Sequence, residues 1–549
     1  MSSNSATSDA TIFRNGRIYT ADPRRSWVAA ICIRGSRIVA VGDEREVITA
    51  AGDNARSIDL AGRMAMPGII DMHNHILEGA RGALFELALA PTMSVATVME
   101  AVRAAIAKTP PGQWISGFGW GPAVAEGFAT AEGMKALDAV SPSHPVVLRD
   151  ITYHSRLANS RAIAAAGLGR IEAAASSPRE VVRDAGGKPT GLFHEMAGAS
   201  IDAAAPPWTE DQLQQSARHG VALLNSLGVT GFNLAVASRA TIAAFHRLDA
   251  SGALTARMAA YIDHRSPLTA ERDGIGTAFV AERRAFATSR IHVDFAKFFM
   301  DGVPSQRTAS MMQDYRDGSA GAQSLFGITE LADLIAPLDR QGISVKVHAI
   351  GDRAIHEVLD AIARVRERNG PGPAHQIAHL NFILPDDIAR IAELNVVADL
   401  CPPLWFPSPI QRRLADLLGQ DFVDRSFPIR DMLRAGVLAA AGTDWPAVSP
   451  SPSPWPGLAT LITRKHPSGE VEGVHRPEQR LSLEEALPLF TINPAKATRI
   501  DGETGSLTPG KSADIIILDR DLTAIAPEDI VLTQVVATFF EGRCVYGKM

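Results

Sequence analysis

The stretch MPGIIDMHNHI, from Met66 to Ile76, is an apolar run that ends in two histidines separated by one residue. A short apolar run bounded by polar residues is typical of a buried strand. In a strand, side chains two residues apart point to the same side, so His73 and His75 would lie together. A buried neutral histidine needs a hydrogen-bond partner. The pair is therefore either a satisfied part of the core or one half of a binding site.

Strand-like and helix-like segments alternate through the middle of the chain. Apolar residues recur at helical spacing in 238–250, directly after a strand-like segment, and again in 329–341. This rhythm favours parallel strands, in either a barrel or an open sheet. With MPGIIDMHNH counted first there are about eight strands, which favours a (β/α)₈ TIM barrel, an α/β fold, over residues 67–490. The other strand-like segments are 229–235, 256–263, 292–302, 343–352, 375–381, 395–401 and 437–444.

The two ends of the chain are rich in short β-like runs. Asn15-Gly16 is a turn signal between two such runs, and Gly35 marks a hairpin. Similar runs follow at 513–518 and 535–540. We therefore predict one small β-sandwich domain built from residues 1–66 and 491–549. Residues 84–205 break the strand–helix rhythm after the first barrel strand, and we interpret them as an insertion over the site.

Composition excludes several classes of function. The chain of 549 residues has a net charge of −6, which argues against nucleic acid as a partner. Its three cysteines, Cys32, Cys401 and Cys544, are far apart, so a disulfide framework is not expected. No apolar run is long enough to span a membrane, and MSSNSATSDA lacks the layout of a secretory signal. We expect a soluble, cytoplasmic protein.

Residues that bind metal or move protons lie near the ends of five strand-like segments. Chemistry in a (β/α)₈ barrel is found at the carboxyl ends of the strands. Zinc favours imidazole and carboxylate ligands, so the set indicates a metal site. These residues are His73, His75, Lys297, His348, His379 and Asp444.

On these and other stretches the chain resembles the amidohydrolase superfamily. Within it, the chain is most similar to the amidohydrolase-3 group, which includes YtcJ-like proteins and N-substituted formamide deformylase. The resemblance extends from about Thr11 to Lys548. The stretches that carry it are PGIIDMHNH (67–75), KFFMDGVPSQRTA (297–309), VKVHAIGDRA (345–354), AHLN (378–381), GTDWP (442–446), TINPA (491–495) and GSLTPGKSADIIILD (505–519).

The resemblance implies a hydrolase with one or two divalent metal ions, expected to be Zn²⁺, in each subunit of a homodimer. It implies that His73, His75 and Asp444 bind the more buried ion, and that His348 and His379 bind the second. Lys297 would carry a carbamate derived from CO₂ and bridge both ions. Asp444 would also act as the general base and then as the general acid.

The family pattern further implies residues that shape the pocket for a small-molecule substrate. Two positions depart from the pattern, since Asn74 separates the paired histidines and Cys401 stands where many relatives have a polar residue. Both departures concern substrate specificity. The implied substrate-binding residues are Trp120, His154, Asn159, His194, Glu195, Asp301, Ser305 and Arg307.

The residues leave other interpretations open. Lys297 could extend its amine to the surface, or could form a Schiff base with a carbonyl substrate. Asp444 could cap a turn, and His154 and His194 could be ordinary packed residues. The expected reaction is hydrolysis of a non-peptide C–N bond, in an amide or N-substituted formamide with an apolar N-substituent. A lactone or other ester, an isomerase or hydratase reaction, and a non-catalytic binding role are the alternatives.

Overall fold

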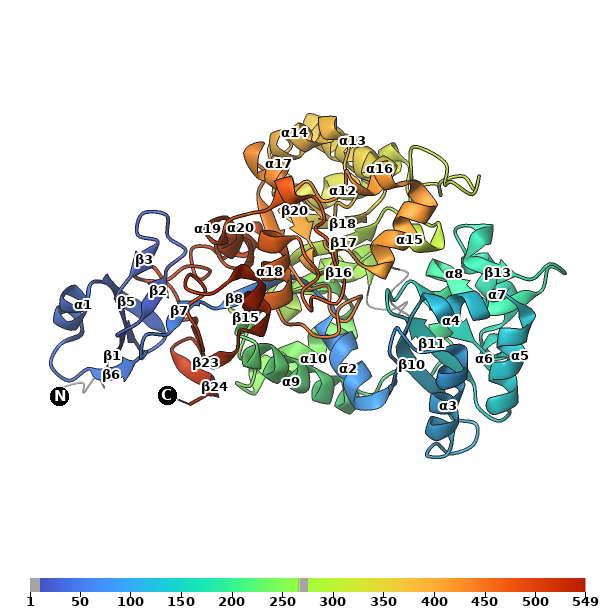
Figure 1. Ribbon diagram of the computed structural model, residues 1–549, viewed down its shortest axis with the longest axis horizontal. Coiled ribbons are helices and arrows are strands. Elements are labelled where there is room, and N and C mark those ends of the chain that lie inside the picture. Colours follow the sequence, from blue (N-terminus) through green and yellow to red (C-terminus); the bar gives the residue numbers. More distant parts are fainter. Residues whose placement is uncertain (1–9, 265, 267–274, 549) are drawn as a thin grey trace.

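The computed structural model describes residues 10–264, 266 and 275–548, and eight parallel strands form its central sheet (Figure 1). The sheet is nearly closed into a barrel, so the predicted α/β barrel fold is confirmed. Residues 1–9 and 549 of the expected end domain lie outside the described residues. In spatial order the strands are β8 (Ile69–Asn74), β15 (Val229–Ala237), β16 (Arg257–Asp263), β17 (Ile291–Phe299), β18 (Ser344–Ala349), β19 (Gln376–His379), β20 (Val397–Leu400) and β21 (Ala439–Ala441).

The barrel closes between its first and last strands, β8 and β21, just beyond their carboxyl ends. The backbone N–H of Asp444 donates to the carbonyl oxygen of His73 at 2.8 Å. The N–H of His75 donates to the carbonyl oxygen of Trp445, also at 2.8 Å. These bonds bring the paired histidines and Asp444 together, although 369 positions separate His75 from Asp444 in the sequence.

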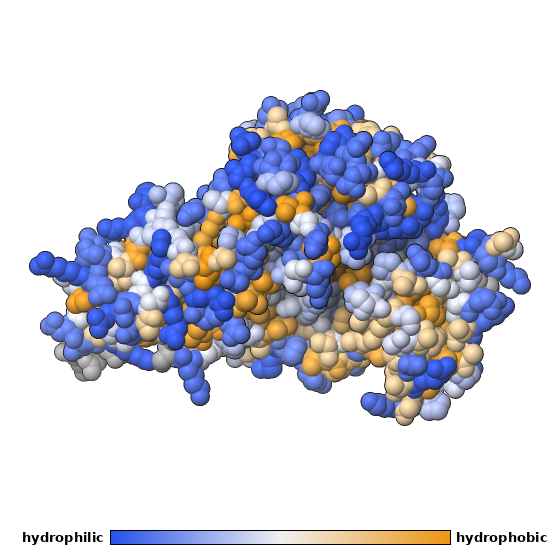
Figure 2. Space-filling view, in the orientation of Figure 1, coloured by the Kyte–Doolittle hydropathy of each residue, from blue (hydrophilic) through white to orange (hydrophobic). Residues whose placement is uncertain are grey.

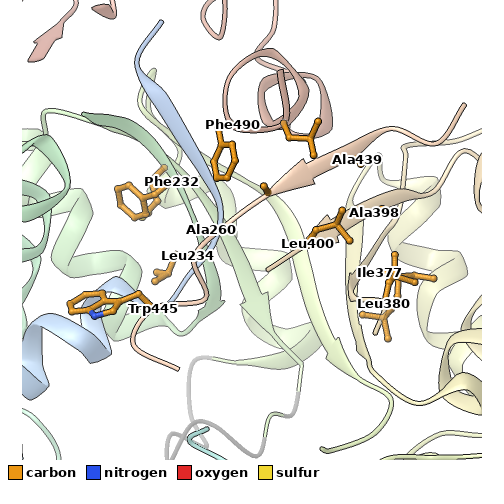
Figure 3. Packing of buried hydrophobic residues seen from close by; sticks show 14 of the residues in the cluster. Phe232, Leu234, Ala260, Ile377, Leu380, Ala398, Leu400, Ala439, Trp445 and Phe490 are labelled. Carbon is orange, nitrogen blue, oxygen red and sulfur yellow. The ribbon is translucent and has the colours of Figure 1, made fainter. Parts of the chain in front are cut away.

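Alternate residues of the barrel strands face the surrounding helices. Phe232 and Leu234 on β15, and Ala398 and Leu400 on β20, belong to one large buried apolar cluster (Figure 3). The helices that cover this face include α9 (Glu210–Ser226), α10 (Arg239–Ala250), α12 (Ile328–Arg340) and α13 (Asp352–Asn369). The alternating residues of the same strands, such as Tyr261 and Phe295, point into the barrel interior. The carboxyl ends of the strands remain available for polar groups.

Strands from both ends of the chain build two further sheets. The turn at Asn15-Gly16 does not join a hairpin, because the strands on either side of it belong to different sheets. The ring of Phe13 packs edge-on to that of Phe539 at 5.1 Å between the two sheets. One sheet holds β5 (Arg37–Gly42), β4 (Ala30–Arg34), β1 (Ala10–Arg14) and β6 (Arg56–Asp59). The other holds β24 (Arg543–Gly547), β23 (Val535–Phe540), β22 (Ile515–Leu518), β7 (Met64–Pro67), β2 (Arg17–Tyr19) and β3 (Trp27–Val28).

The insertion after the first barrel strand has a sheet and a core of its own, and it lies at the right of Figure 1. It follows α2 (Ile76–Phe85), and α8 (Glu195–Asp202) leads back toward the barrel. Its strands are β13 (Val181–Arg183), β14 (Pro189–His194), β12 (Ser155–Ala158), β11 (Val146–Asp150), β10 (Ile115–Trp120) and β9 (Leu87–Ala88). Within the described part of the chain, no helix has both the length and the apolar character needed to span a membrane.

Candidate metal centre

Two histidines and one carboxylate meet at the mouth of the barrel. The Oδ1 atom of Asp444 lies 3.5 Å from Nε2 of His73 and 3.4 Å from Nε2 of His75. All three side chains are buried. Two ligands of one tetrahedral zinc ion, each bonded at 2.0–2.1 Å, are about 3.3 Å apart. The three residues therefore fit a divalent metal ion by donor chemistry and by spacing.

Local backbone structure places these three side chains. His73 lies on β8, and His75 follows the strand as the residue that precedes α2. Asp444 lies after β21 with φ of 58°, a left-handed conformation that a non-glycine residue adopts at a cost of about 1 kcal/mol or more. The hydrogen bond to the carbonyl oxygen of His73 holds Asp444 in this conformation.

A buried ion pair fixes the orientation of His73. Its Nδ1 lies 2.7 Å from Oδ2 of Asp399, and the same oxygen is 2.7 Å from Nζ of Lys346. Because a carboxylate only accepts, Nδ1 carries the proton and Nε2 keeps its lone pair for a metal. The Nζ atom of Lys346 also donates to the carbonyl oxygen of Met72 at 2.8 Å. Our sequence analysis missed Asp399 and Lys346, although Lys346 lies two residues before His348 and so on the same side of β18.

A second group of donors lies on the other side of Asp444. The Nδ1 atom of His379 is 4.0 Å from Oδ2 of Asp444 and 3.6 Å from Sγ of Cys401. Strand alternation from Gln376 would direct His379 toward the helices, but His379 has φ of 78°. Its ring thus lies 4.6 Å from that of His348, whose Nε2 is 3.4 Å from the carbonyl oxygen of Gly302.

The electrostatics of the barrel mouth favour the neutral form of three imidazoles, those of His73, His348 and His379. Burial, and then the nearby Lys297 and Lys346, hold the pKa of His73 well below its usual range. The pKa values of His348 and His379 are also well below the usual range, because of burial first and then of neighbouring histidines and Lys297. Burial and Lys346 lower the pKa of Lys297 to about 8. Neutral imidazoles have a free lone pair, which metal binding requires.

An ion pair from the insertion faces this cluster. The Nδ1 atom of His154 lies 2.8 Å from Oε2 of Glu195, and Thr308 donates to Oε1 of Glu195 at 2.7 Å. Burial alone would lower the pKa of His154, but Glu195 outweighs it and the pKa is raised. Burial would raise the pKa of Glu195, but His154 outweighs it and the pKa is lowered. Each partner thus favours the charged form of the other, and the His154 ring lies 5.4 Å from that of His348.

Four other predicted substrate residues line the cavity. The ring of His194 accepts from or donates to the Ser155 hydroxyl at 2.9 Å, and burial lowers the pKa of His194 to about 4. Trp120 donates its indole N–H to a backbone carbonyl in the insertion. Ser305 and Arg307 also border the cavity, and Arg307 forms an ion pair with Asp317.

The structure does not bring Asn159 and Asp301 to the cavity wall. The Oδ1 atom of Asn159 accepts from the backbone N–H of Ala162 at 3.0 Å, so this residue caps a helix of the insertion. Asp301 accepts three backbone hydrogen bonds, from Ser310, Ile350 and Gly351, at 2.9–3.0 Å. The amide of Asn159 and the carboxylate of Asp301 therefore hold the backbone in place. The residue types alone did not reveal this structural role.

The cluster lies at the floor of a large cavity of about 2300 Å³ between the barrel and the insertion. Figure 2 shows the surface hollowed between these two parts. His73, His75, Lys297, His348 and Asp444 all border the cavity. Aromatic side chains from the insertion and from the barrel loops line its walls, namely Phe85, Trp114, Trp120, Trp208 and Phe406.

The sequence is similar to known proteins over almost its whole length. Residues 56–546 match the model of a family described as the amidohydrolase family. The chain is 28% identical over 547 residues to the N-substituted formamide deformylase of Arthrobacter pascens, covering 97% of this chain and 98% of that one. It is 26% identical over 555 residues to the putative amidohydrolase YtcJ of Bacillus subtilis, covering 98% and 99%.

Solved structures share the fold. An uncharacterized metal-dependent hydrolase from Pyrococcus furiosus superposes with a TM-score of 0.70 at 23% identity, covering 93% of this chain and 99% of that one. A second such hydrolase, from Pyrococcus horikoshii, gives 0.73 at 22% identity, covering 94% and 99%.

Proposed function

The chain belongs to the amidohydrolase family, and from this premise we propose that it is a metal-dependent hydrolase of a non-peptide C–N bond, in an N-substituted formamide or a related small amide. One observation carries the proposal. Nε2 of His73, Nε2 of His75 and Oδ1 of Asp444 converge within 4.8 Å of one another at the floor of the cavity.

His73, His75 and Asp444 would hold the metal ion. When bound, a divalent cation supplies a Lewis acid for the substrate carbonyl and an acidified water as the nucleophile. The ion pair of Asp399 with Lys346 keeps the proton of His73 on Nδ1, away from the metal side. The chain thus contributes two imidazoles and one carboxylate in a fixed arrangement.

Proton transfer would fall to Asp444. Its Oδ2 atom faces away from the paired histidines, so it can accept the proton of the attacking water and pass it to the leaving nitrogen. Glu195 favours the protonated form of His154 beside His348, and the Nε2–H of His154 would donate to the substrate oxygen as negative charge develops there.

The cavity walls indicate the kind of substrate. Aromatic residues of the cavity walls, with Trp114, Trp208 and Phe406 among them, suit an apolar N-substituent, and the reacting amide would lie beside the candidate metal ligands. The likeness to N-substituted formamide deformylase supports this class of substrate. A formyl carbon has only hydrogen as its second substituent, so it needs little room beside the metal ligands.

A second metal position is part of the proposal. His379 and His348 lie with their rings 4.6 Å apart beside Asp444. Lys297 is 99% buried at this place, and a carbamate on its amine would turn a cation that repels metal into an anion with two donor oxygens. The reaction of the neutral amine with CO₂ forms the N–C bond and releases one proton.

The experiment that tests the function has two readouts. We expect the purified chain to contain divalent metal that chelator removes, and to release formate from formamides with aromatic N-substituents only when loaded with metal. A panel of lactones and esters measured beside the formamides separates the carbon–oxygen alternative. Metal-free protein that retains full formamide hydrolysis would contradict the proposal.

A further inference from the structure

Cys401 is buried beside the metal centre, and the reaction described above does not use it. It follows β20, and 2% of its surface is exposed. Its Sγ atom lies 3.6 Å from Nδ1 of His379. Cys401, His379 and Asp444 form a group whose donor atoms all lie within 4.8 Å of one another.

We propose that Cys401 is a thiolate ligand of the second metal position introduced above, which it shares with His379. The proposal rests on the proposed metal-dependent function. It adds a sulfur ligand to the second position, which is distinct from the position held by His73 and His75. Its chemistry selects a borderline-soft cation such as zinc over magnesium or manganese, because thiolate is a soft donor.

The spacing supports ligation. Zinc bonds sulfur at about 2.3 Å and imidazole nitrogen at about 2.0–2.1 Å, so tetrahedral ligands of these two kinds are about 3.6 Å apart. The observed separation between Sγ of Cys401 and Nδ1 of His379 is 3.6 Å. An S–H···N hydrogen bond would give a similar distance, and the experiment below distinguishes the two.

Asp444 lies between the two donor groups. Its Oδ1 faces Nε2 of His73 and His75 at 3.5 and 3.4 Å, while its Oδ2 faces Nδ1 of His379 at 4.0 Å. One carboxylate therefore presents a separate oxygen to each donor group. The second group, unlike the first, has a sulfur atom among its donors.

The test replaces the native metal by Co²⁺, whose bond to thiolate gives a charge-transfer absorption in the near ultraviolet. We expect this band in the wild-type chain with two equivalents of cobalt. It should be lost in Cys401→Ser, together with about one equivalent of bound metal. Cys32→Ser is the matched control because Cys32 is also buried but lies in β4 of the end domain. Cys544→Ser controls for the exposed thiol.

X-ray absorption on the wild-type zinc protein gives a second measurement that needs no variant. A sulfur neighbour of zinc at about 2.3 Å is expected. Zinc bound without any sulfur neighbour, or a cobalt band that survives in Cys401→Ser, would overturn the assignment while the hydrolase proposal stands. Failure to bind any metal would instead overturn the proposed function itself.

Discussion

The barrel mouth and the insertion above it both bury many ionisable groups, but they balance charge differently. In the insertion, Arg149 and Arg156 both donate to the carboxylate of Asp202 at 2.9–3.3 Å, and Arg149 also reaches Glu86 at 2.8 Å. Opposite charges thus meet within hydrogen-bond distance. At the barrel mouth, imidazoles lie beside one another and beside lysines, and the pKa values of His379, His73 and His348 are all lowered.

The difference separates a structural network from a site. A buried charge without a partner costs several kcal/mol, so a network that only stabilises the fold is expected to be complete. Neutral imidazoles that share one carboxylate, Asp444, gain most when a cation joins them. Each prediction below changes one of the two regions and measures whether the effect appears in metal binding or in stability.

The largest effect is expected for His75→Ala. The remaining His73 and Asp444 supply only two donors, so bound metal should fall and hydrolysis should drop by about 1000-fold or more. Metal content and formate release measure both effects. His356→Ala is the matched control, because His356 lies on α13 and pairs with Asp387 outside the cavity. Unchanged metal content in His75→Ala would remove this residue from the centre.

Asp202→Ala should destabilise the insertion without removing metal. It leaves Arg149 with only Glu86 and takes the carboxylate from Arg156, so the cost should be about 3–5 kcal/mol. Hydrogen exchange of the amides in β11 and β12 measures the local loss of protection. If metal content falls while this protection is retained, Asp202 supports the metal centre rather than the fold of the insertion.

A smaller effect is expected for a change at Asp399, which orients His73 of the metal centre. Asp399→Asn keeps the shape of the side chain but loses the charge that Lys346 and His73 share. Removing such a supporting carboxylate weakens metal affinity by about 10–100-fold. Competition with a chelator of known affinity measures it. Equal affinity in the variant would show that Asp399 does not control the tautomer of His73.

The sequence predicted the barrel, and its six candidate ligands all border one cavity, but it missed residues that surround them. Strand ends are recognisable because apolar runs stop at polar residues, as at His73 and Asp444. The supporting residue Asp399 was missed because its partner Lys346 lies 53 positions away, and local patterns carry no such pairing. Asn159 was expected at the substrate, but an asparagine that caps a helix has the same local sequence as one that binds a ligand.

The smallest effect concerns pH and the ion pair between His154 and Glu195. The folded-state pKa of His154 is raised above its ordinary 6.5, so its contribution is present below pH 6.5 and is lost as pH rises through the folded value. The folded-state pKa of Glu195 is lowered from 4.5, so its contribution is present above pH 4.5 and is lost at lower pH. Asp150 strengthens the charged form of His154, and Arg156 opposes it.

His154→Gln should therefore lose about 1 kcal/mol of stability between pH 4.5 and 6.5, and less at alkaline pH. Unfolding of wild type and variant across this range measures the difference. His144→Gln is the control, since His144 is buried in the same insertion but pairs with a backbone carbonyl oxygen. A loss that does not change with pH would mean that His154 contributes by packing alone. A loss confined to this window would show that the insertion presents a charged imidazolium to neutral imidazoles at the barrel mouth.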